Sequence, residues 1–375
     1  MLAFQIILAG LSGIVVLQTA LSFVRSRAWW VRIFDFPRPQ ITLCSAGLLV
    51  LFGATAIGPE RVLSWQRVYV GLLAGAVFAQ LWQIIPYTRL WRIRVPPAPP
   101  RVATEQRLRL LVSNVCMKNR QAQRWIDLVR EEKPHIAIAV EVDAWWRDQL
   151  RALHKDWPHH VCEAQDNTYG MAIYSRLPLG PTRVEHLVDP EVPSLFTAVE
   201  LPGGRTVHCA VLHPRPPRPD IQQDSSLRDA ELVRAGRIVR ELRGPVIVAG
   251  DLNDVAWSHT THLFQRIASL LDPRVGRGLF ATFPVRHRFM RFPLDHVFHS
   301  RDFDLVELRR LPDIGSDHFP MLIELALRET AQDRPEPPEC DADDEEQATD
   351  AVEDAREERA SESPAERAAR EAADR

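Results

Sequence analysis

The segment PVIVAGDLNDVAW, residues 245–257, passes directly from small apolar residues to acidic and amide side chains. Asp251, Asn253 and Asp254 are residue types that favour turns, so one interpretation is simply a strand that leaves the core. The alternative is that a buried strand holds Asp251 and Asn253 in fixed positions facing a substrate, since strands position side chains more accurately than loops do. The distribution of polar residues over the rest of the chain favours the second interpretation.

The same pattern recurs at other apolar runs, which begin or end with a polar side chain able to take part in chemistry. One such residue alone is most often a turn or cap residue. Several together predict a site, because strand ends in an α/β body converge on a shared rim. The candidates are Asn114 after RLRLLVS, Glu141 after IAIAV, His213 after VHCAVL, Asp251 and Asn253, Asp295 before HVF, and Asp317 with His318 before FPMLIELAL.

These residue types define a particular kind of site. Carboxylate and amide oxygens are hard ligands that suit Mg²⁺ or Mn²⁺, and histidines beside acids can orient and exchange protons. The sequence contains no serine or cysteine nucleophile motif and no spacing typical of a soft-metal site. The set therefore predicts metal-assisted attack of water on a phosphate ester.

Short strands and amphipathic helices have to position these side chains. Apolar runs rich in β-branched residues alternate with segments whose apolar residues recur every three or four positions. We therefore predict an α/β (α+β) body. The expected strands are residues 107–114, 135–142, 206–213, 246–253, 294–300 and 319–327, and the expected helices are residues 121–133 and 226–242.

The order of the motifs SN, VE, LH, GDLND, LDHVF and SDHFP resembles that of the endonuclease/exonuclease/phosphatase family of metal-dependent phosphoesterases. The resemblance covers about residues 106–327, and GDLN and SDH are its most specific elements. It implies a four-layered sandwich of two β-sheets flanked by helices. It also implies hydrolysis of a phosphodiester or phosphomonoester by direct attack of water.

The resemblance further implies a role for each acid and amide. Asn114 and Glu141 would bind the metal, with Glu141 as the principal ligand, and Asp317 would belong to the metal shell. Asp251 would orient or deprotonate the attacking water, and Asn253 would steady the phosphoryl oxygens. The implied cofactor is Mg²⁺ (or Mn²⁺).

The roles implied for the histidines concern the phosphate itself. His318 resembles the essential histidine of the family, polarised by Asp295, and His213 would contact the scissile phosphate. GMAIYSRLPL (170–179) also resembles a family stretch and implies Arg176 as a substrate-binding residue. An ordinary surface arginine at a strand end explains Arg176 equally well.

The first 94 residues differ in composition from the rest and are interpreted as a membrane anchor (1–94). Three uncharged apolar segments, about 2–24, 41–58 and 68–87, are close to the length of about 20 residues that a helix needs to cross a bilayer. Buried core helices or a cleaved signal peptide are the alternatives. A signal peptide has a basic start, whereas this N-terminus has no basic side chain and two further apolar segments follow. We therefore expect three transmembrane helices.

The arginines around these segments indicate the orientation of the anchor. Four arginines lie in the first connection and four follow the third segment, whereas the second connection has two, Arg61 and Arg67. Because positive charge favours the cytoplasmic side, the N-terminus is expected outside. The catalytic domain is then expected in the cytoplasm, held at the cell membrane.

The remaining domain boundaries follow from composition. A proline-rich linker at 95–105 precedes the catalytic domain at 106–328, and an acidic tail occupies 329–375. The tail contains 18 acids, 6 arginines and almost no large apolar side chains. Such a composition cannot bury enough surface to offset the entropy of ordering, so we expect the tail to be disordered. Its alternating charges could support a transient helix near residues 350–372.

Without that tail the chain is basic. The whole chain has a net charge of −3, and the tail contributes −12, so residues 1–328 carry +9. A basic body suits an anionic partner, and both nucleic acid and a phospholipid headgroup stay open as the phosphate-ester substrate. Five cysteines without regular spacing disfavour a disulfide scaffold. His259 and His262 lack a matching acid and are interpreted as helix-surface residues.

These features together predict a membrane-anchored, Mg²⁺-dependent phosphoesterase. A catalytically silent membrane scaffold or sensor that retains the fold is the alternative, and the presence of all the acids and histidines disfavours it. A transporter is also disfavoured, because the three apolar segments carry no charge.

Overall fold

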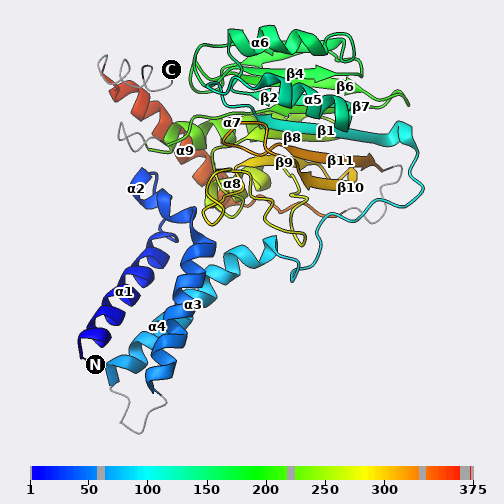
Figure 1. The fold of residues 1–375 in the computed structure, drawn as a ribbon. Helices are drawn as coiled ribbons and strands as arrows, with labels where there is room; N and C mark the ends of the chain where they lie inside the picture. Colours follow the sequence, from blue (N-terminus) through cyan, green and yellow to red (C-terminus); the bar gives the residue numbers. More distant parts are fainter. Residues whose placement is uncertain (1, 57–63, 218–223, 329–334, 364–371, 373–375) are drawn as a thin grey trace.

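A globular body carries a bundle of three apolar helices that projects from one side (Figure 1). The computed structural model describes residues 2–56, 64–217, 224–328, 335–363 and 372. Arg61, one of the arginines that indicated the orientation of the anchor, lies outside these residues.

Two mixed β-sheets form the centre of the body. One has the strand order β10-β11-β1-β2-β4-β3 and the other β5-β6-β7-β8-β9. The strands of the first sheet are β1 (Arg107–Asn114), β2 (Ile136–Val140), β3 (His159–Glu163), β4 (Met171–Ser175), β10 (Phe303–Arg310) and β11 (Met321–Leu327). Those of the second are β5 (Arg183–Glu185), β6 (Ser194–Glu200), β7 (Thr206–Val211), β8 (Val246–Asp251) and β9 (Asp295–His299).

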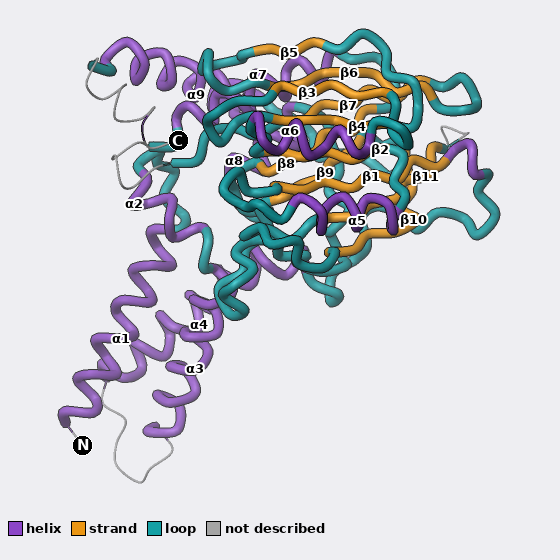
Figure 2. The backbone as a smooth tube through the Cα atoms, turned by 45° about the horizontal axis from the view of Figure 1, so that its top comes forward, coloured by secondary structure: helices purple, strands orange, loops and turns teal. Residues whose placement is uncertain are grey.

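Helices cover the outer face of each sheet and complete four layers (Figure 2). The helices α5 (Ala122–Glu132) and α6 (Ala144–Leu150) pack on the first sheet. The helices α7 (Ser226–Glu241) and α8 (His259–Ile267) pack on the second. The α/β prediction and the layered arrangement of two sheets flanked by helices are confirmed.

Alternation along the strands explains why both faces of each sheet are buried. Successive side chains of a strand point to opposite faces, so Leu110 and Val112 of β1 face the second sheet and pack in one core with Ile247 of β8. Leu111 faces the other way and packs with Trp125 of α5. Burial on both faces fixes the strands and therefore the side chains at their ends.

Strand direction decides which ends share a rim. β1 and β2 run parallel, as do β7 and β8, so their C-terminal ends lie at the same rim. β9 runs antiparallel to β8, with Asp295 opposite Asp251, and β11 runs antiparallel to β1, with Met321 opposite Val112. The starts of β9 and β11 therefore arrive where the other four strands end.

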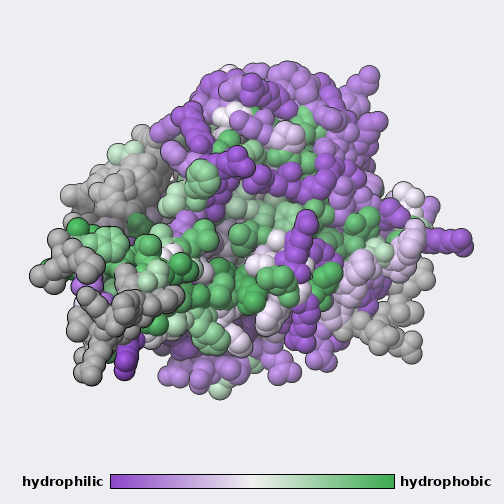
Figure 3. Space-filling model, turned by 60° about the horizontal axis from the view of Figure 1, so that its bottom comes forward, coloured by the Kyte–Doolittle hydropathy of each residue, from purple (hydrophilic) through white to green (hydrophobic). Residues whose placement is uncertain are grey.

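Three apolar helices precede the body: α1 (Leu2–Leu21), α3 (Arg38–Ala56) and α4 (Ser64–Ile84). The stretches Phe4–Leu21 and Trp65–Tyr87 are long and apolar enough to cross a membrane, whereas the apolar stretch of α3, Arg38–Ala54, is shorter. Only 22% of each of the two longer stretches is buried. Seen from the side of the bundle, the surface carries many green, apolar residues, and purple, hydrophilic residues cover much of the rest (Figure 3).

The segment between the first two of these helices is attached to the body. It contains the short helix α2 (Trp29–Arg32) and the turn η1 (Ile33–Asp35). Trp257 Nε1 donates to the carbonyl of Asp35 (2.7 Å), and Arg32 Nη2 donates to Thr260 Oγ1 (2.7 Å). Where the chain leaves α4, at the same end of the bundle, the Tyr87 hydroxyl donates to the carbonyl of Ala256 (2.6 Å). These contacts fix the helices relative to the catalytic strands.

The expectation that residues 329–375 are disordered is wrong for residues 342–361. They form α9 (Ala342–Ser361), which begins with a capping box between Asp341 and Asp344. Arg266 of α8 holds Asp344 through two hydrogen bonds of 2.7 and 2.8 Å. The parts of the tail at 329–334, 364–371 and 373–375 lie outside the described residues.

Small side chains explain how α9 packs without large apolar residues. Ala348 lies in a cluster with Val233 of α7 and with Leu263 and Ile267 of α8. Alanine lets the backbone of α9 approach the body closely. Most of the apolar surface that this contact buries therefore belongs to the residues of α7 and α8 that α9 covers. Composition alone does not reveal this, because the apolar area belongs to the partner helices.

Ala348→Asp is expected to lower the melting temperature by several degrees, because it places an unpaired carboxylate in this cluster. For domains of this size about 1 kcal/mol corresponds to a shift of roughly 2–4 °C. Thermal unfolding followed by circular dichroism measures the change. The matched control is Ala342→Asp, at an exposed position of the same helix, which should leave the melting temperature unchanged. Equal melting temperatures for the two variants would contradict the packing of α9.

Candidate active site

Asp251, at the end of β8, is the centre of the cluster, with only 1% of its surface exposed. Asn114, at the end of β1, donates through Nδ2 both to Asp251 Oδ2 (3.0 Å) and to Glu141 Oε1 (2.7 Å). Asn114 Oδ1 accepts from the backbone amide of Cys116 (2.9 Å). The amide nitrogen of Asn114 therefore faces the acids, and this side chain bridges the two sheets.

Glu141 follows β2 in a left-handed backbone conformation, with φ of 65°. Its second oxygen, Oε2, accepts from the backbone amide of Met117 (2.9 Å). Burial raises the pKa of Glu141 to about 7, although the hydrogen bonds from Asn114 and Met117 work in the opposite direction. A divalent cation offsets this cost, because its charge favours the carboxylate form.

His318 lies between two carboxylates. Its Nδ1 is 2.8 Å from Asp295 Oδ2, and its Nε2 is 3.5 Å from Asp251 Oδ2. Burial by itself lowers the pKa of His318, but Asp295 and Asp251 outweigh it and raise the pKa to about 10. The imidazole is therefore held in a fixed orientation and carries a proton at neutral pH.

His213 approaches the same acid from the end of β7. Its Nε2 lies 3.9 Å from Asp251 Oδ2, and its ring packs against Tyr169 with centroids 5.6 Å apart. Burial lowers the pKa of His213 to about 4, although Asp251 works in the opposite direction. A neutral and a protonated imidazole thus flank one carboxylate.

The turn after β8 contains two polar residues with different surroundings, Asn253 and Asp254. Asn253 has a φ of 51°, donates its backbone amide to Asp251 Oδ1 (2.9 Å) and lines the cavity described below. Asp254 instead accepts from Ser258 Oγ (2.5 Å) at the start of α8 and lies 3.5 Å from Arg32 Nη2. Asn253 therefore fits the interpretation of a side chain that faces a substrate, and Asp254 fits the interpretation of a turn residue.

Asp317 completes the acids of the rim. It is exposed and lines the same cavity as Glu141 and His318. The neighbouring Ser316 Oγ donates to the carbonyl of Asn114 (2.8 Å). This bond ties the loop before β11 to the end of β1 and brings Asp317 to the side of Glu141.

A cavity of about 360 Å³ opens above these groups. Glu141, Asp251, Asn253, Asp317 and His318 form its polar part. The rest of its lining consists of Trp29, Arg32, Ile33 and Phe36 from the N-terminal segment and Pro216, Pro217, Phe283 and Leu294 from the body. The N-terminal contribution was not predicted, because the sequence marks these residues only as a connection between two apolar helices.

The prediction of Arg176 as a substrate-binding residue is wrong. β4 runs antiparallel to β2, with Ser175 opposite Ile136 at the start of β2. Arg176 therefore lies at the opposite rim, about five residues or roughly 15 Å away at about 3.3 Å per residue. Its guanidinium stacks over Trp157 at 4.4 Å.

The start of β4 supplies the residues that do reach the rim. Tyr169 packs against His213, and the guanidinium of the buried Arg215 lies 4.7 Å from the Tyr169 ring. Gly170 follows, and a Cβ atom there would lie 2.0 Å from the carbonyl oxygen of Val142. The dipeptide Tyr-Gly before an apolar run was the available sequence signal.

The donor set fits a divalent metal ion. Asp251, Asp295 and His318 each offer a ligand atom within 4.8 Å of the others. Asp295 Oδ1 is buried without a hydrogen-bond partner among the described residues, and carboxylate oxygens are the ligands preferred by Mg²⁺. This group could hold a metal ion, as could the neighbouring pair Glu141 and Asp317.

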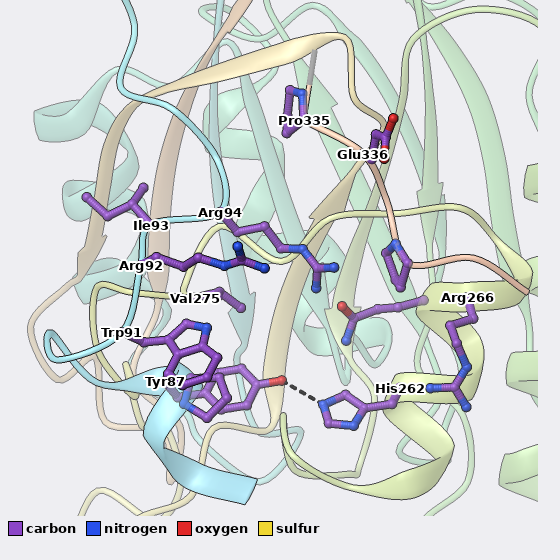
Figure 4. Close-up of a pocket in the computed structure, with 13 residues that line it drawn as sticks. Tyr87, Trp91, Arg92, Ile93, Arg94, His262, Arg266, Val275, Pro335 and Glu336 are labelled. Carbon is purple, nitrogen blue, oxygen red and sulfur yellow. Dashed lines mark hydrogen bonds between the residues drawn. The ribbon is translucent and has the colours of Figure 1, made fainter. Parts of the chain in front are cut away.

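A second cavity, of about 620 Å³, lies outside the cluster where the chain leaves α4 (Figure 4). Arg92 and Arg94 point into it, and the Tyr87 hydroxyl is 3.0 Å from His262 Nε2. His262 thus contacts the N-terminal segment, contrary to its interpretation as a helix-surface residue. None of the strand-end acids lines this cavity, so the smaller cavity is the candidate active site.

Fold and site together define an α/β domain of two packed sheets whose strand ends carry a buried acid–histidine cluster able to hold a metal. The model of the Endonuclease/Exonuclease/phosphatase family matches residues 111–318. This is more than half of the chain, and the chain belongs to this family, which comprises metal-dependent phosphoesterases. The resemblance seen in the sequence is thereby confirmed for the catalytic domain.

Several solved structures are similar to this chain. An endonuclease/exonuclease/phosphatase from Beutenbergia cavernae is 20% identical, with 59% of this chain and 72% of that chain covered and a TM-score of 0.45. The human Nocturnin catalytic domain with bound sulfate is 17% identical, with 62% and 99% covered and a TM-score of 0.49.

TDP2 of D. rerio, complexed with a single-strand DNA product, is 14% identical, with 58% of this chain and 98% of that chain covered and a TM-score of 0.48. Identities and TM-scores of this order carry no inference about the substrate of this chain. No curated protein sequence gives a significant match.

Proposed function

We propose that this protein is a membrane-anchored, metal-dependent phosphoesterase that cleaves its substrate by direct attack of water. One observation carries the proposal: a single buried carboxylate, Asp251, faces His318 at 3.5 Å while Asn114 donates to it at 3.0 Å, at the floor of a cavity. A strand end with a purely structural role needs no such convergence from three strands and two sheets.

In the proposed reaction Asp251 accepts the proton of the attacking water, and His318, held by Asp295, offers positive charge to the phosphoryl oxygens. Asn253 and His213 would contact the phosphate from the two flanking strand ends. General acid–base groups of this kind contribute about 10²–10⁴-fold to turnover.

We further propose that Asn114, Glu141 and Asp317 hold a Mg²⁺ (or Mn²⁺) ion, and that Asn114 also orients Glu141 through the 2.7 Å hydrogen bond. When bound, the ion would offset the negative charge that develops on the phosphate. The second possible position is the group of Asp251, Asp295 and His318, which the metal titration described in the Discussion distinguishes.

Two features support a membrane anchor. A helix in the core of a soluble protein is mostly buried, whereas the stretches Phe4–Leu21 and Trp65–Tyr87 are buried over only 22% of their residues. A cleaved signal sequence at α1 would not account for the attachment of the adjoining segment through Arg32 and Asp35. The arginine distribution supports a cytoplasmic catalytic domain.

The test is hydrolysis of a soluble aryl phosphodiester and a soluble aryl phosphomonoester by the full chain in detergent. We expect that a chelator abolishes hydrolysis of at least one of them and that added Mg²⁺ or Mn²⁺ restores it. Hydrolysis that is insensitive to the chelator would contradict the metal requirement. A folded protein that hydrolyses neither ester at any metal concentration would favour the catalytically silent scaffold.

A further inference from the structure

We propose that the substrate is a phosphate ester carried by a lipid, which enters the cavity from the bilayer that holds the N-terminal helices. The inference rests on the proposed function and adds the substrate class to it. Three observations support it: the apolar wall of the cavity, its continuity with the exposed helix surface, and a loop of the body beside α3.

The cavity has two chemically different sides. Its floor is formed by Glu141, Asp251 and His318, which suit a phosphate and a cation. The apolar part of the lining consists of Trp29, Ile33 and Phe36 from the N-terminal segment and Phe283 and Leu294 of the body, with the Phe283 ring 4.7 Å from that of His318. A ligand that satisfies both sides carries a phosphate next to a hydrocarbon portion.

The apolar wall continues outward to the helix bundle. Ile33 lines the cavity and is still 49% exposed, and the neighbouring Trp30 is 53% exposed. α2 begins at Trp29, shortly after the apolar helix α1 ends at Leu21. Exposed apolar side chains therefore adjoin the lining of the cavity at the end of the bundle that faces the body.

The distribution of exposed apolar side chains places the bilayer at this side of the body. Of the 22 exposed large apolar side chains among the described residues, 20 lie before residue 94. The other two are Phe289, 85% exposed, and Met290, 45% exposed. Both belong to the loop RHRFMR (286–291), in which this adjacent apolar pair is flanked by Arg288 and Arg291. Apolar side chains next to arginines are typical of segments that insert into the bilayer interface.

This loop lies beside the start of α3. Gln40 Nε2 donates to the carbonyl of Phe289 (2.8 Å), and Pro39, Gln40 and Leu43 line a shallow cavity with Phe289 and Arg291. Positive charge next to a membrane surface is attracted by anionic headgroups. The loop and the helices thus meet from two parts of the chain, and the cavity residues Phe36 and Phe283 shortly precede α3 and the loop in the sequence.

The lining is less suited to a polynucleotide. Binding of single-stranded nucleic acid uses a groove with cations along the backbone. Among the described residues that line the cavity, the cations are Arg32 and His318. Arg32 is already paired with Asp35 (3.2 Å) and Asp254 (3.5 Å), and His318 with Asp295. Among the described residues the lining therefore offers one group of phosphate-binding side chains, which includes His318, beside apolar side chains and no row of cations.

The test uses the full chain in phosphatidylcholine vesicles that contain a headgroup-labelled phospholipid, with a fluorescent single-stranded oligonucleotide and a soluble aryl phosphodiester in parallel reactions. We expect metal-dependent turnover of the lipid to exceed that of both soluble substrates. Ile33→Ser should lower the ratio of lipid to aryl-diester turnover by about tenfold, since the loss of apolar contact in a pocket costs about 10-fold or more.

Leu72→Ser is the matched control, because Leu72 is 46% exposed on α4, away from the cavity. It should leave the ratio unchanged. A second variant, F289S/M290S, should lower the ratio without changing the melting temperature. Preference for the oligonucleotide or the aryl diester, or a ratio unaffected by Ile33→Ser, would overturn the inference and leave the proposed function intact. No turnover of any substrate with metal would overturn both.

Discussion

Replacing either Asp251 or His318 with alanine is expected to lower metal-dependent turnover by about 100-fold or more, which is the contribution typical of general acid–base groups. The two side chains face each other at 3.5 Å and act on one water and one phosphate in the proposed reaction. Residues that act as a unit are not additive, so the double variant should be little worse than the poorer single variant. Turnover at saturating substrate and metal measures both effects.

The matched control for this experiment is Asp156→Asn. Asp156 is exposed and precedes β3, whose first residue pairs with Ser175 at the opposite rim. The control should retain normal turnover, and thermal unfolding should show that every variant is folded. Near-normal turnover of the Asp251 and His318 variants would mean that the polar strand ends serve only as turns.

Glu141→Gln is expected to raise the metal concentration for half-maximal activity by about tenfold or more. Loss of a residue that merely supports a metal ligand costs about 10- to 100-fold, and loss of a carboxylate ligand should cost at least as much. The amide keeps the shape of the side chain but has one accepting oxygen, so it can accept from Asn114 or from Met117 and not from both. The change therefore removes the negative charge and one hydrogen bond while leaving the packing volume nearly the same. Turnover measured across a Mg²⁺ titration gives the value.

Asp295→Asn is the comparison, because it alters the partner of His318 at 2.8 Å. It should lower turnover without a comparable shift in the Mg²⁺ titration. A larger shift for Asp295→Asn than for Glu141→Gln would place the ion in the group of Asp251, Asp295 and His318 instead. Restoration of Glu141→Gln activity by high Mg²⁺ would support the proposed position.

The strand ends of the site could be predicted from the sequence because the information is local. An apolar run that stops at Asn114 or Asp251 marks both the strand and the residue at its end. Because both faces of the sheet are buried, a shift in strand register would bury the polar side chain in the core. The apolar runs also predicted a mixed α/β (α+β) body, and the four layers followed from the family resemblance. The starts of β9 and β11 were also identified correctly, as Asp295 and His318 show.

Arg176 shows where local information fails. The sequence marks the two ends of β4 but does not say in which direction the strand crosses the sheet. β4 pairs antiparallel with β2, so its start at Tyr169 and Gly170 reaches the rim and its end does not. Direction is set by pairing between distant segments, and only the tertiary structure decides it.

The tail and the N-terminal segment show the same limit for packing. The apolar surface that α9 covers belongs to α7 and α8, so the composition of residues 329–375 could not reveal it. Similarly, Trp29, Ile33 and Phe36 lie more than 100 residues from Asp251 in sequence, and nothing in their local pattern connects them with a cavity. The sequence by itself determined the strands, the residue types at their ends and the apolar helices, because each of these features depends on residues that are consecutive in the chain. The tertiary structure alone decided which rim each strand reaches and which apolar surface faces the phosphate site, because both depend on contacts between segments far apart in the chain.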